Sequence, residues 1–248
     1  MKANERKKKY KWSDIAWRDL NLIPIAIVGL FIFSYAGLAL GWLYFGHISE
    51  LQLAMIGTLG QLMAYVVVFF VFYFLHIHTF GERFKKGIIY LKKRWFIIII
   101  VFLIALGLSN LYDYLMQFLP KHLQYSDTQN EMALDQLFET HAFIPFAFLM
   151  IVIAGPVVEE LVFRHIIIGE LGKKFNFIVM GIVSAITFTL IHVTDAKSPF
   201  EFGAYFILAL SLVFVYLISG RNLAASIGLH MLNNLVSFIY TVWTIFYK

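Results

Sequence analysis

Two adjacent glutamates, Glu159 and Glu160, lie inside a long apolar run, in the stretch AGPVVEELVFR that ends at Arg164. A charged side chain within a membrane is costly, so each one marks a candidate functional site. Glu160 and Arg164 are four residues apart, share one face of a helix and can form an ion pair. Glu159 points about 100° away from that face, so a structural ion pair at a helix end does not account for it. Pro156 lacks an N–H and is expected to kink or loosen the helix just before the pair.

Two later apolar runs carry histidines. The stretch FTLIH ends at His192, and the stretch HMLNN places His230 four residues before Asn234, on the same helix face. Glu159 and His192 lie equally far along the chain from a predicted turn at 172–176, so an antiparallel pair of helices would bring them to one depth. His230 lies about eight residues into its own run and reaches that depth only if the two earlier helices extend about 12 Å into the cytoplasm.

Together these groups fit hydrolysis. Glu159, helped by His192, can hold a water and deprotonate it as general base, because a carboxylate in an apolar site becomes a stronger base. His230 and Asn234 can donate hydrogen bonds to the oxyanion that develops when water attacks. A zinc site with Glu159, His192 and His230 as ligands is the competing interpretation. The chain contains no HExxH motif and no cysteine, which excludes thiolate catalysis and cysteine-ligated zinc.

The three motifs together resemble those of a known family. EExxFR at 159–164, FxxxH at 188–192 and HxxxN at 230–234 look like the motifs of the CPBP family, the CAAX-protease and bacteriocin-processing (Abi) intramembrane proteases. The resemblance covers about residues 142–246. It implies a helical bundle with the site in a cavity between these spans.

The resemblance also implies roles for these residues. Glu159 and His192 would activate water, and His230 and Asn234 would stabilise the oxyanion. Members of the family are often labelled metallo-endopeptidases, whereas the eukaryotic prenyl-protein endopeptidase branch resembles a metal-independent glutamate hydrolase. The metal-free version is favoured here, with Zn²⁺ as the alternative cofactor. The supporting residues would be Glu160, Arg164 and Phe188. One departure is His165, where many members carry glycine; it could crowd the cavity or add a titratable group.

The composition predicts a membrane protein that consists of helices alone. Of the 248 residues, 60% are hydrophobic and 14% are charged, whereas soluble domains carry about 25% charged residues. A spanning helix needs about 20 mostly apolar residues, which predicts a polytopic bundle with about seven spans. The predicted spans are 21–45, 52–76, 95–119, 142–168, 176–196, 201–219 and 222–246.

Basic residues set the orientation. With seven spans, the Lys- and Arg-rich loops all fall on one side, which predicts a cytoplasmic N-terminus. The predicted domains are a basic N-terminal segment (1–20), N-terminal spans (21–141) and a catalytic core (142–248). Residues 82–94 are interpreted as a cytoplasmic loop, with a helix on the inner membrane surface as the alternative. His76 and His78 are interpreted as interfacial, and Gln61 as bonding a neighbouring helix.

The leading hypothesis is an intramembrane endopeptidase of a plasma membrane, multi-pass and bacterial. Its partners would be the lipid bilayer and a membrane-associated peptide or protein: a pheromone or bacteriocin precursor, or a lipidated tail. The net charge of +5 follows from the loops, so nucleic-acid binding is not expected. The alternatives are a non-catalytic scaffold or bacteriocin immunity protein that retains the protease fold, and a small-solute transporter, although the chain shows no paired halves.

Overall fold

The structure is a computed structural model that describes residues 10–247, apart from 126–127, 129–131 and 133–135. Within this described part the chain is helical and contains no β-strand. The long helices are α1 (Leu22–Phe45), α2 (Glu50–Leu75), α3 (Ile77–Met116), α8 (Phe177–His192), α9 (Glu201–Ile218) and α10 (Leu223–Tyr247). Short 3₁₀ turns precede or connect them: η1 (Trp12–Asp14), η2 (Trp17–Asn21), η3 (Lys121–Leu123), η4 (Gln136–Phe138) and η5 (His141–Phe143).

The span that carries the paired glutamates is one continuous but irregular helix, called here the central span (His141–Phe175). After η5 it alternates between α-helical and π-helical hydrogen bonding, and π-helical turns often mark functional sites. Its parts are α5 (Ile144–Phe148), η6 (Leu149–Ala154), α6 (Gly155–Glu160), η7 (Leu161–Leu171) and α7 (Gly172–Phe175), of which η6 and η7 are π-helical.

The prediction of a polytopic helical bundle is confirmed. Six helices of the described chain are long and apolar enough to cross a membrane, and α8 is a shorter apolar helix of 16 residues. Helix α1 buries only Leu22 along its length, as expected of a helix whose apolar side chains face lipid. The protein is therefore a multi-pass membrane protein.

Residues 82–94 are helical, so the preferred interpretation of this segment as an ordinary loop is wrong. They belong to α3, which contains one residue with non-helical torsion angles, Arg94, at φ −128° and ψ 17°. This kink separates the basic first part of α3 from the apolar part that was predicted as the third span. The first part packs on the start of α10, because Gly87 lies so close to Ala224 that an added Cβ would come within 2.7 Å of its Cβ.

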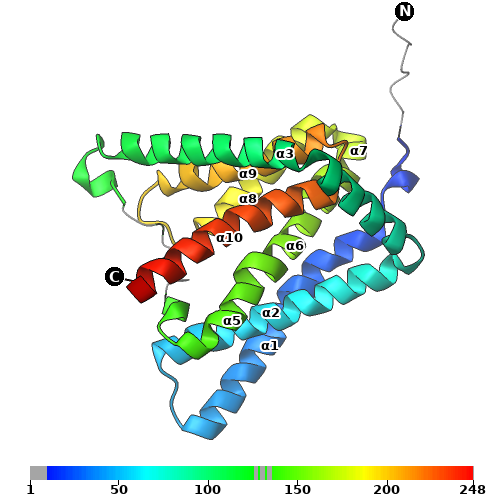
Figure 1. Cartoon of the computed structure of the whole chain (residues 1–248). Helices are drawn as coiled ribbons and strands as arrows, with labels where there is room; N and C mark the ends of the chain where they lie inside the picture. Colours follow the sequence, from blue (N-terminus) through cyan, green and yellow to red (C-terminus); the bar gives the residue numbers. More distant parts are fainter. Residues whose placement is uncertain (1–9, 126–127, 129–131, 133–135, 248) are drawn as a thin grey trace, which may run out of the picture.

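The central span contributes to all three buried apolar clusters of the bundle, and Figure 1 shows α6 running between α10 and α2. Phe163 and Ile168 pack with α3, α8, α9 and α10. Val158 and Ile166 pack with residues of α1 and α2. Val152 packs with Phe238 of α10 and with η4. The long helices of the bundle are thus packed against this span.

Helices α1 and α2 form a hairpin whose contact is lined by small residues. Gly29 lies against Ala64, and Gly60 lies against the backbone of Ser34. Small residues let helix backbones approach closely in lipid, where packing rather than water exclusion holds helices together. The hairpin lies against the central span through α2, which contacts both η6 and α6.

We expect Gly60→Ala to lower the free energy of unfolding by about 1–3 kcal/mol, because the new methyl group overpacks the interface. Its Cβ would lie 2.8 Å from Ser34 N and 3.0 Å from Ser34 Cα, both backbone atoms that cannot move alone. Gly57→Ala, on the same helix, is the matched control, since nothing lies within 4 Å of that position. Unfolding in detergent micelles measures both, and equal stability of the two variants would contradict this packing.

Candidate active site

An ion pair is fully buried at the end of α6. Arg164 Nη1 lies 2.9 Å from Glu160 Oε1, and neither side chain is exposed. Arg164 Nη2 also donates to the carbonyl of Ala209 on α9, at 3.3 Å, and its guanidinium lies 4.8 Å from the ring centre of Phe188. The i, i+4 pairing expected from the sequence is therefore present, and it ties the central span to α8 and α9.

His230 of α10 connects the two glutamates. Its Nδ1 lies 3.0 Å from Glu160 Oε1, and its Nε2 lies 3.7 Å from Glu159 Oε2. The Nε2 of His192, at the end of α8, lies 3.8 Å from the same Glu159 oxygen. One carboxylate oxygen thus faces two imidazole nitrogens that come from different helices. The structure therefore brings Glu159, His192 and His230 together, as the sequence predicted.

The tautomer of the His192 ring is set by its own helix. Its Nδ1 lies 2.8 Å from the carbonyl oxygen of Phe188, and because a carbonyl only accepts, Nδ1 must carry the hydrogen. In the neutral tautomer that this bond selects, the lone pair of Nε2 faces Glu159. Stacking holds the ring in this orientation, with the ring centre of Phe188 at 4.4 Å and that of Tyr205 at 5.1 Å.

Two acceptors that face each other at 3.8 Å cannot bond directly, since that distance is beyond hydrogen-bond range. A water molecule between Glu159 and His192 could donate one hydrogen to each of them, which would orient its oxygen for attack. A Zn²⁺ ion is the other species that such a set of acceptors suits, because carboxylate oxygen and imidazole nitrogen are both its ligands. The side chains of Glu159 and His192 are each 17% exposed, so the site is partly open.

Asn234 lies one turn beyond His230 and contacts the backbone of the central span. Gly155 N–H donates to the carbonyl of Met150, five residues back. The next donor in this π-helical register would be residue 156, which is proline and has no N–H. Asn234 Nδ2 replaces it, donating to the carbonyl of Ile151 at 2.9 Å. Pro156 therefore loosens the helix as expected, and Asn234 occupies the position that the missing N–H leaves.

Phe188 and Ser184 fix α8 against the central span. The ring of Phe188 is 1% exposed and packs edge-on against Phe163, with ring centres 5.2 Å apart. Ser184 donates to the carbonyl of Phe163 at 2.9 Å. These contacts set the height of His192 relative to Glu159. The sequence identified Phe188 through its motif, whereas Ser184 carried no signal.

Three polar residues outside this cluster have contacts that the sequence did not predict. His76, at the junction of α2 and α3, is buried and lies 2.9 Å from the carboxylate of Asp19; burial lowers the pKa of its imidazole, against the opposing effect of the Asp19 charge. His165 neither crowds nor enters the glutamate cluster and lies 2.8 Å from the same carboxylate. Gln61 bonds Tyr65 of its own helix at 3.0 Å, not a neighbouring helix.

Comparison with known proteins supports the same region of the chain. Residues 141–236 match a family described as type II CAAX prenyl endopeptidase Rce1-like. A stretch of 49 residues, 20% of this chain, is 39% identical to the "Putative membrane peptidase YdiL" of Bacillus subtilis, and a stretch of 97 residues, 37% of this chain, is 35% identical to the "Membrane-embedded CAAX protease MroQ" of Staphylococcus aureus.

These matches support the resemblance of residues 141–236 to the CPBP family. The matched stretches span 20% and 37% of the lengths of the two relatives, and no solved structure matches the chain. The description of the family names an endopeptidase, and the names of the two bacterial relatives describe a membrane peptidase and a membrane-embedded protease. The family match runs from residue 141 to residue 236, so it contains all three motifs that gather around Glu159.

Replacing Arg164 tests how this site is held together. We expect Arg164→Gln to destabilise the protein by about 3–5 kcal/mol, because Glu160 would keep an uncompensated charge in the core. The double variant Glu160→Gln/Arg164→Gln should recover part of this loss, since it removes both charges. Unfolding in detergent micelles provides the measurement, with Arg83→Gln, on the exposed surface of α3, as control. A double variant no more stable than Arg164→Gln would rule out the charge explanation.

Proposed function

We propose that this protein is an intramembrane endopeptidase that hydrolyses a peptide bond with a water molecule held between Glu159 and His192. One observation carries the proposal. Glu159 Oε2 faces the Nε2 atoms of His230 and His192 at 3.7 and 3.8 Å. In the neutral His192 ring, the contact of Nδ1 with the Phe188 carbonyl leaves Nε2 as an acceptor. The family and the names of the bacterial relatives support the same class of reaction.

The reaction follows from the positions of these groups. The water oxygen attacks the carbonyl carbon of the substrate and passes one proton to Glu159 as general base. The carbonyl oxygen becomes an oxyanion in a tetrahedral intermediate. The carbon–nitrogen bond then breaks, and the amine leaves with the proton that Glu159 had taken. A carboxylic acid and an amine are released, so atoms and protons balance.

His230 is the proposed donor to the oxyanion. Glu160 accepts from its Nδ1, and the Nε2 of His230, which lies 3.7 Å from Glu159 Oε2, would donate to the oxyanion when it also carries a hydrogen. Asn234 is the proposed second donor. One of its two amide hydrogens bonds Ile151, which leaves the other for substrate. Glu160 and Arg164 act through His230, so they are positioning residues in this mechanism.

Zinc is the alternative cofactor. Glu159, His192 and His230 would hold the ion, which would act as a Lewis acid and lower the pKa of bound water. The donor atoms are of the right chemical types, and the same three residues are needed in both versions. A metal requirement would appear as loss of activity when metal is removed from the protein and recovery when Zn²⁺ is returned.

A substrate for this site must enter the membrane region. The three motifs lie on apolar helices, so a peptide bond reaches Glu159 only if its chain is held in the bilayer by an apolar segment or a lipid. The proposed substrate class is therefore a membrane-associated peptide or protein. A C-terminal lipidated tail fits the printed name of the family, and a membrane-bound precursor peptide fits the same geometry.

We expect Glu159→Gln and His192→Gln each to lower kcat by at least about 100-fold, the usual range for removal of a general base or its partner. Purified protein in proteoliposomes, given a library of membrane-tethered peptides, provides the rates. Glu82→Gln and His78→Gln are matched controls, since both side chains are exposed on α3, and they should retain wild-type rates.

The same variants separate an enzyme from a scaffold. If neither substitution changes cleavage, or if a cellular phenotype of the protein survives both, hydrolysis at Glu159 is rejected. The alternative role as a non-catalytic scaffold or bacteriocin immunity protein would then stand. The wild-type protein, assayed on the same peptides without their membrane tether, should cleave them far more slowly.

Replacing Asn234 distinguishes a donor to the oxyanion from a structural residue. We expect Asn234→Ala to lower kcat about 10²–10³-fold with little change in KM, as for loss of a hydrogen bond made only in the transition state. Asn110→Ala is the control, because Asn110 also donates to a helix carbonyl but lies exposed on α3. A fall in thermal stability with unchanged kcat would assign Asn234 to holding Ile151 alone.

A further inference from the structure

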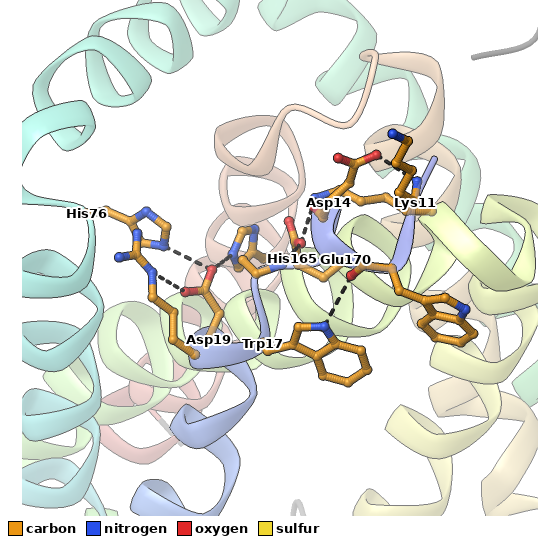
Figure 2. Close-up of polar contacts among 11 residues, drawn as sticks. Lys11, Asp14, Trp17, Asp19, His76, His165 and Glu170 are labelled. Atoms are coloured by element: carbon orange, nitrogen blue, oxygen red, sulfur yellow. Dashed lines mark hydrogen bonds and ion pairs between the residues drawn. The ribbon is translucent and has the colours of Figure 1, made fainter. Parts of the chain in front are cut away.

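The segment before α1 contacts the C-terminal end of the central span. The charge pattern predicts that this end lies on the cytoplasmic side. Glu170 accepts from the backbone N–H of Ala16 at 2.6 Å. Lys173 donates to the carbonyl of Asp14 at 2.7 Å, and Lys174 donates to that of Tyr10 at 3.0 Å. Figure 2 shows this N-terminal segment lying across the helix that carries His165 and Glu170. The contacts give it one fixed position against the helix of the active site.

Next to these contacts, three ligand-type side chains from distant parts of the chain converge. Asp19 lies in η2, His76 at the junction of α2 and α3, and His165 in η7. Asp19 Oδ2 lies 2.9 Å from His76 Nε2 and 2.8 Å from His165 Nε2, as Figure 2 shows. Within the described part of the chain, this is the one set of three such residues whose ligand atoms all lie within 4.8 Å of one another.

We propose that Asp19, His76 and His165 form a binding site for a divalent transition metal ion, of which Zn²⁺ fits best, and that this ion joins the N-terminal segment and the α2–α3 junction to the central span. The site is separate from the Glu159 cluster, because it uses none of its residues. It is independent of the proposed peptidase function.

The chemistry of the donors favours zinc. Two imidazole nitrogens and a carboxylate oxygen form a common protein ligand set for Zn²⁺, at about 2.0–2.2 Å each. In a tetrahedral site such ligand atoms lie about 3.3 Å apart. Each imidazole nitrogen would therefore need to move away from Asp19 Oδ2 by roughly half an ångström. His165 is partly exposed, with 12% of its side chain accessible, so the cluster has an open side for an ion and a fourth ligand.

The carboxylate of Asp19 supplies the second, independent observation. Its side chain is 0% exposed, and its Oδ1 is buried with no hydrogen-bond partner among the described residues. A buried carboxylate oxygen without a donor is costly, and a bound cation removes that cost. The nearest counter-charge, Arg18 Nε, lies 3.8 Å from Oδ1 on a side chain that is 58% exposed, so it can turn into water when a metal ion binds. The charge of Arg83 also reaches His76.

The test is the zinc content of the full-length protein in detergent, after treatment with a chelator and addition of one to three equivalents of Zn²⁺. We expect His76→Gln and His165→Gln each to bind one equivalent less than the wild type. His78→Gln, two residues from His76 and exposed, should bind as much as the wild type. Glu159→Gln should retain the equivalent of Zn²⁺ that His76→Gln and His165→Gln lose. This result separates the proposed site from any metal at the active site.

Two further measurements keep the result clear if a variant folds poorly. Co²⁺ added to wild-type protein should give the visible absorption of a four-coordinate ion, and His165→Cys, which supplies another zinc ligand, should retain metal that His165→Gln loses. Zn²⁺ should also raise the unfolding temperature of the wild type and of Glu159→Gln, but not of His76→Gln. Equal zinc content in the wild type and in both glutamine variants, or no Co²⁺ absorption in the wild type, would overturn the proposal and leave a hydrogen-bonded Asp–His cluster.

Discussion

The buried pair of Glu160 and Arg164 is the constraint on which the site depends. An unpaired charge in the core of a membrane protein is costly, so the two groups must meet, and their 2.9 Å contact fixes one face of the central span. Arg164 is held in turn by the Ala209 carbonyl and by the Phe188 ring, which brings α9 and α8 to the same height. His230 completes the set by bonding the same oxygen of Glu160. Pairing one glutamate in this way allows the adjacent one to remain without a fixed cationic partner, with its oxygen facing two imidazoles.

The irregular central span follows from the same requirement for satisfied backbone groups. A π-helical register leaves the Ile151 carbonyl without the donor that Pro156 cannot supply, and in lipid such a carbonyl needs another partner. Asn234 supplies this donor from α10, so the backbone irregularity and the motif on another helix are two parts of one contact.

The second π-helical stretch, η7, has a different effect. Because it winds more residues into each turn than an α-helix, it advances less per residue, which reduces the difference in depth between Glu159 and His230 that α-helical spacing predicts.

Much of the site could be predicted from the sequence by two rules. Residues four apart share one face of a helix, and a charged side chain inside an apolar run is costly and therefore marks a functional or paired group. Glu160 with Arg164, and Glu159 with His192 across the turn, follow from those two rules. The helices themselves follow from length and hydropathy, with α8 shorter and α3 longer than predicted.

Contacts between elements far apart in the chain could not be predicted from the sequence. Asp19 stands in a polar segment that has no periodicity, and His76 and His165 look unremarkable alone, so nothing in the pattern connects residues 19, 76 and 165. The Ile151 partner of Asn234 was missed for a different reason, since it depends on a π-helical register that no side-chain pattern shows.

The two polar clusters share the central span, and this has a physical consequence for the proposed mechanism. His165 directly follows Arg164, so the group that is bonded to Asp19 and the group that holds Glu160 are neighbours on a π-helical stretch. A π-helix has fewer ways to adjust than a loop, because rotating one residue moves its neighbours with it. Any displacement of the N-terminal segment that pulls on His165 would therefore change the position of Arg164 before it changed Glu159. In the proposed mechanism Arg164 and Glu160 act through His230, and Arg164 also lies against the ring of Phe188, which stacks on His192. Such a displacement would therefore disturb both the proposed donor to the oxyanion and the imidazole that faces Glu159. The position of the N-terminal segment would thus affect the proposed site through Arg164.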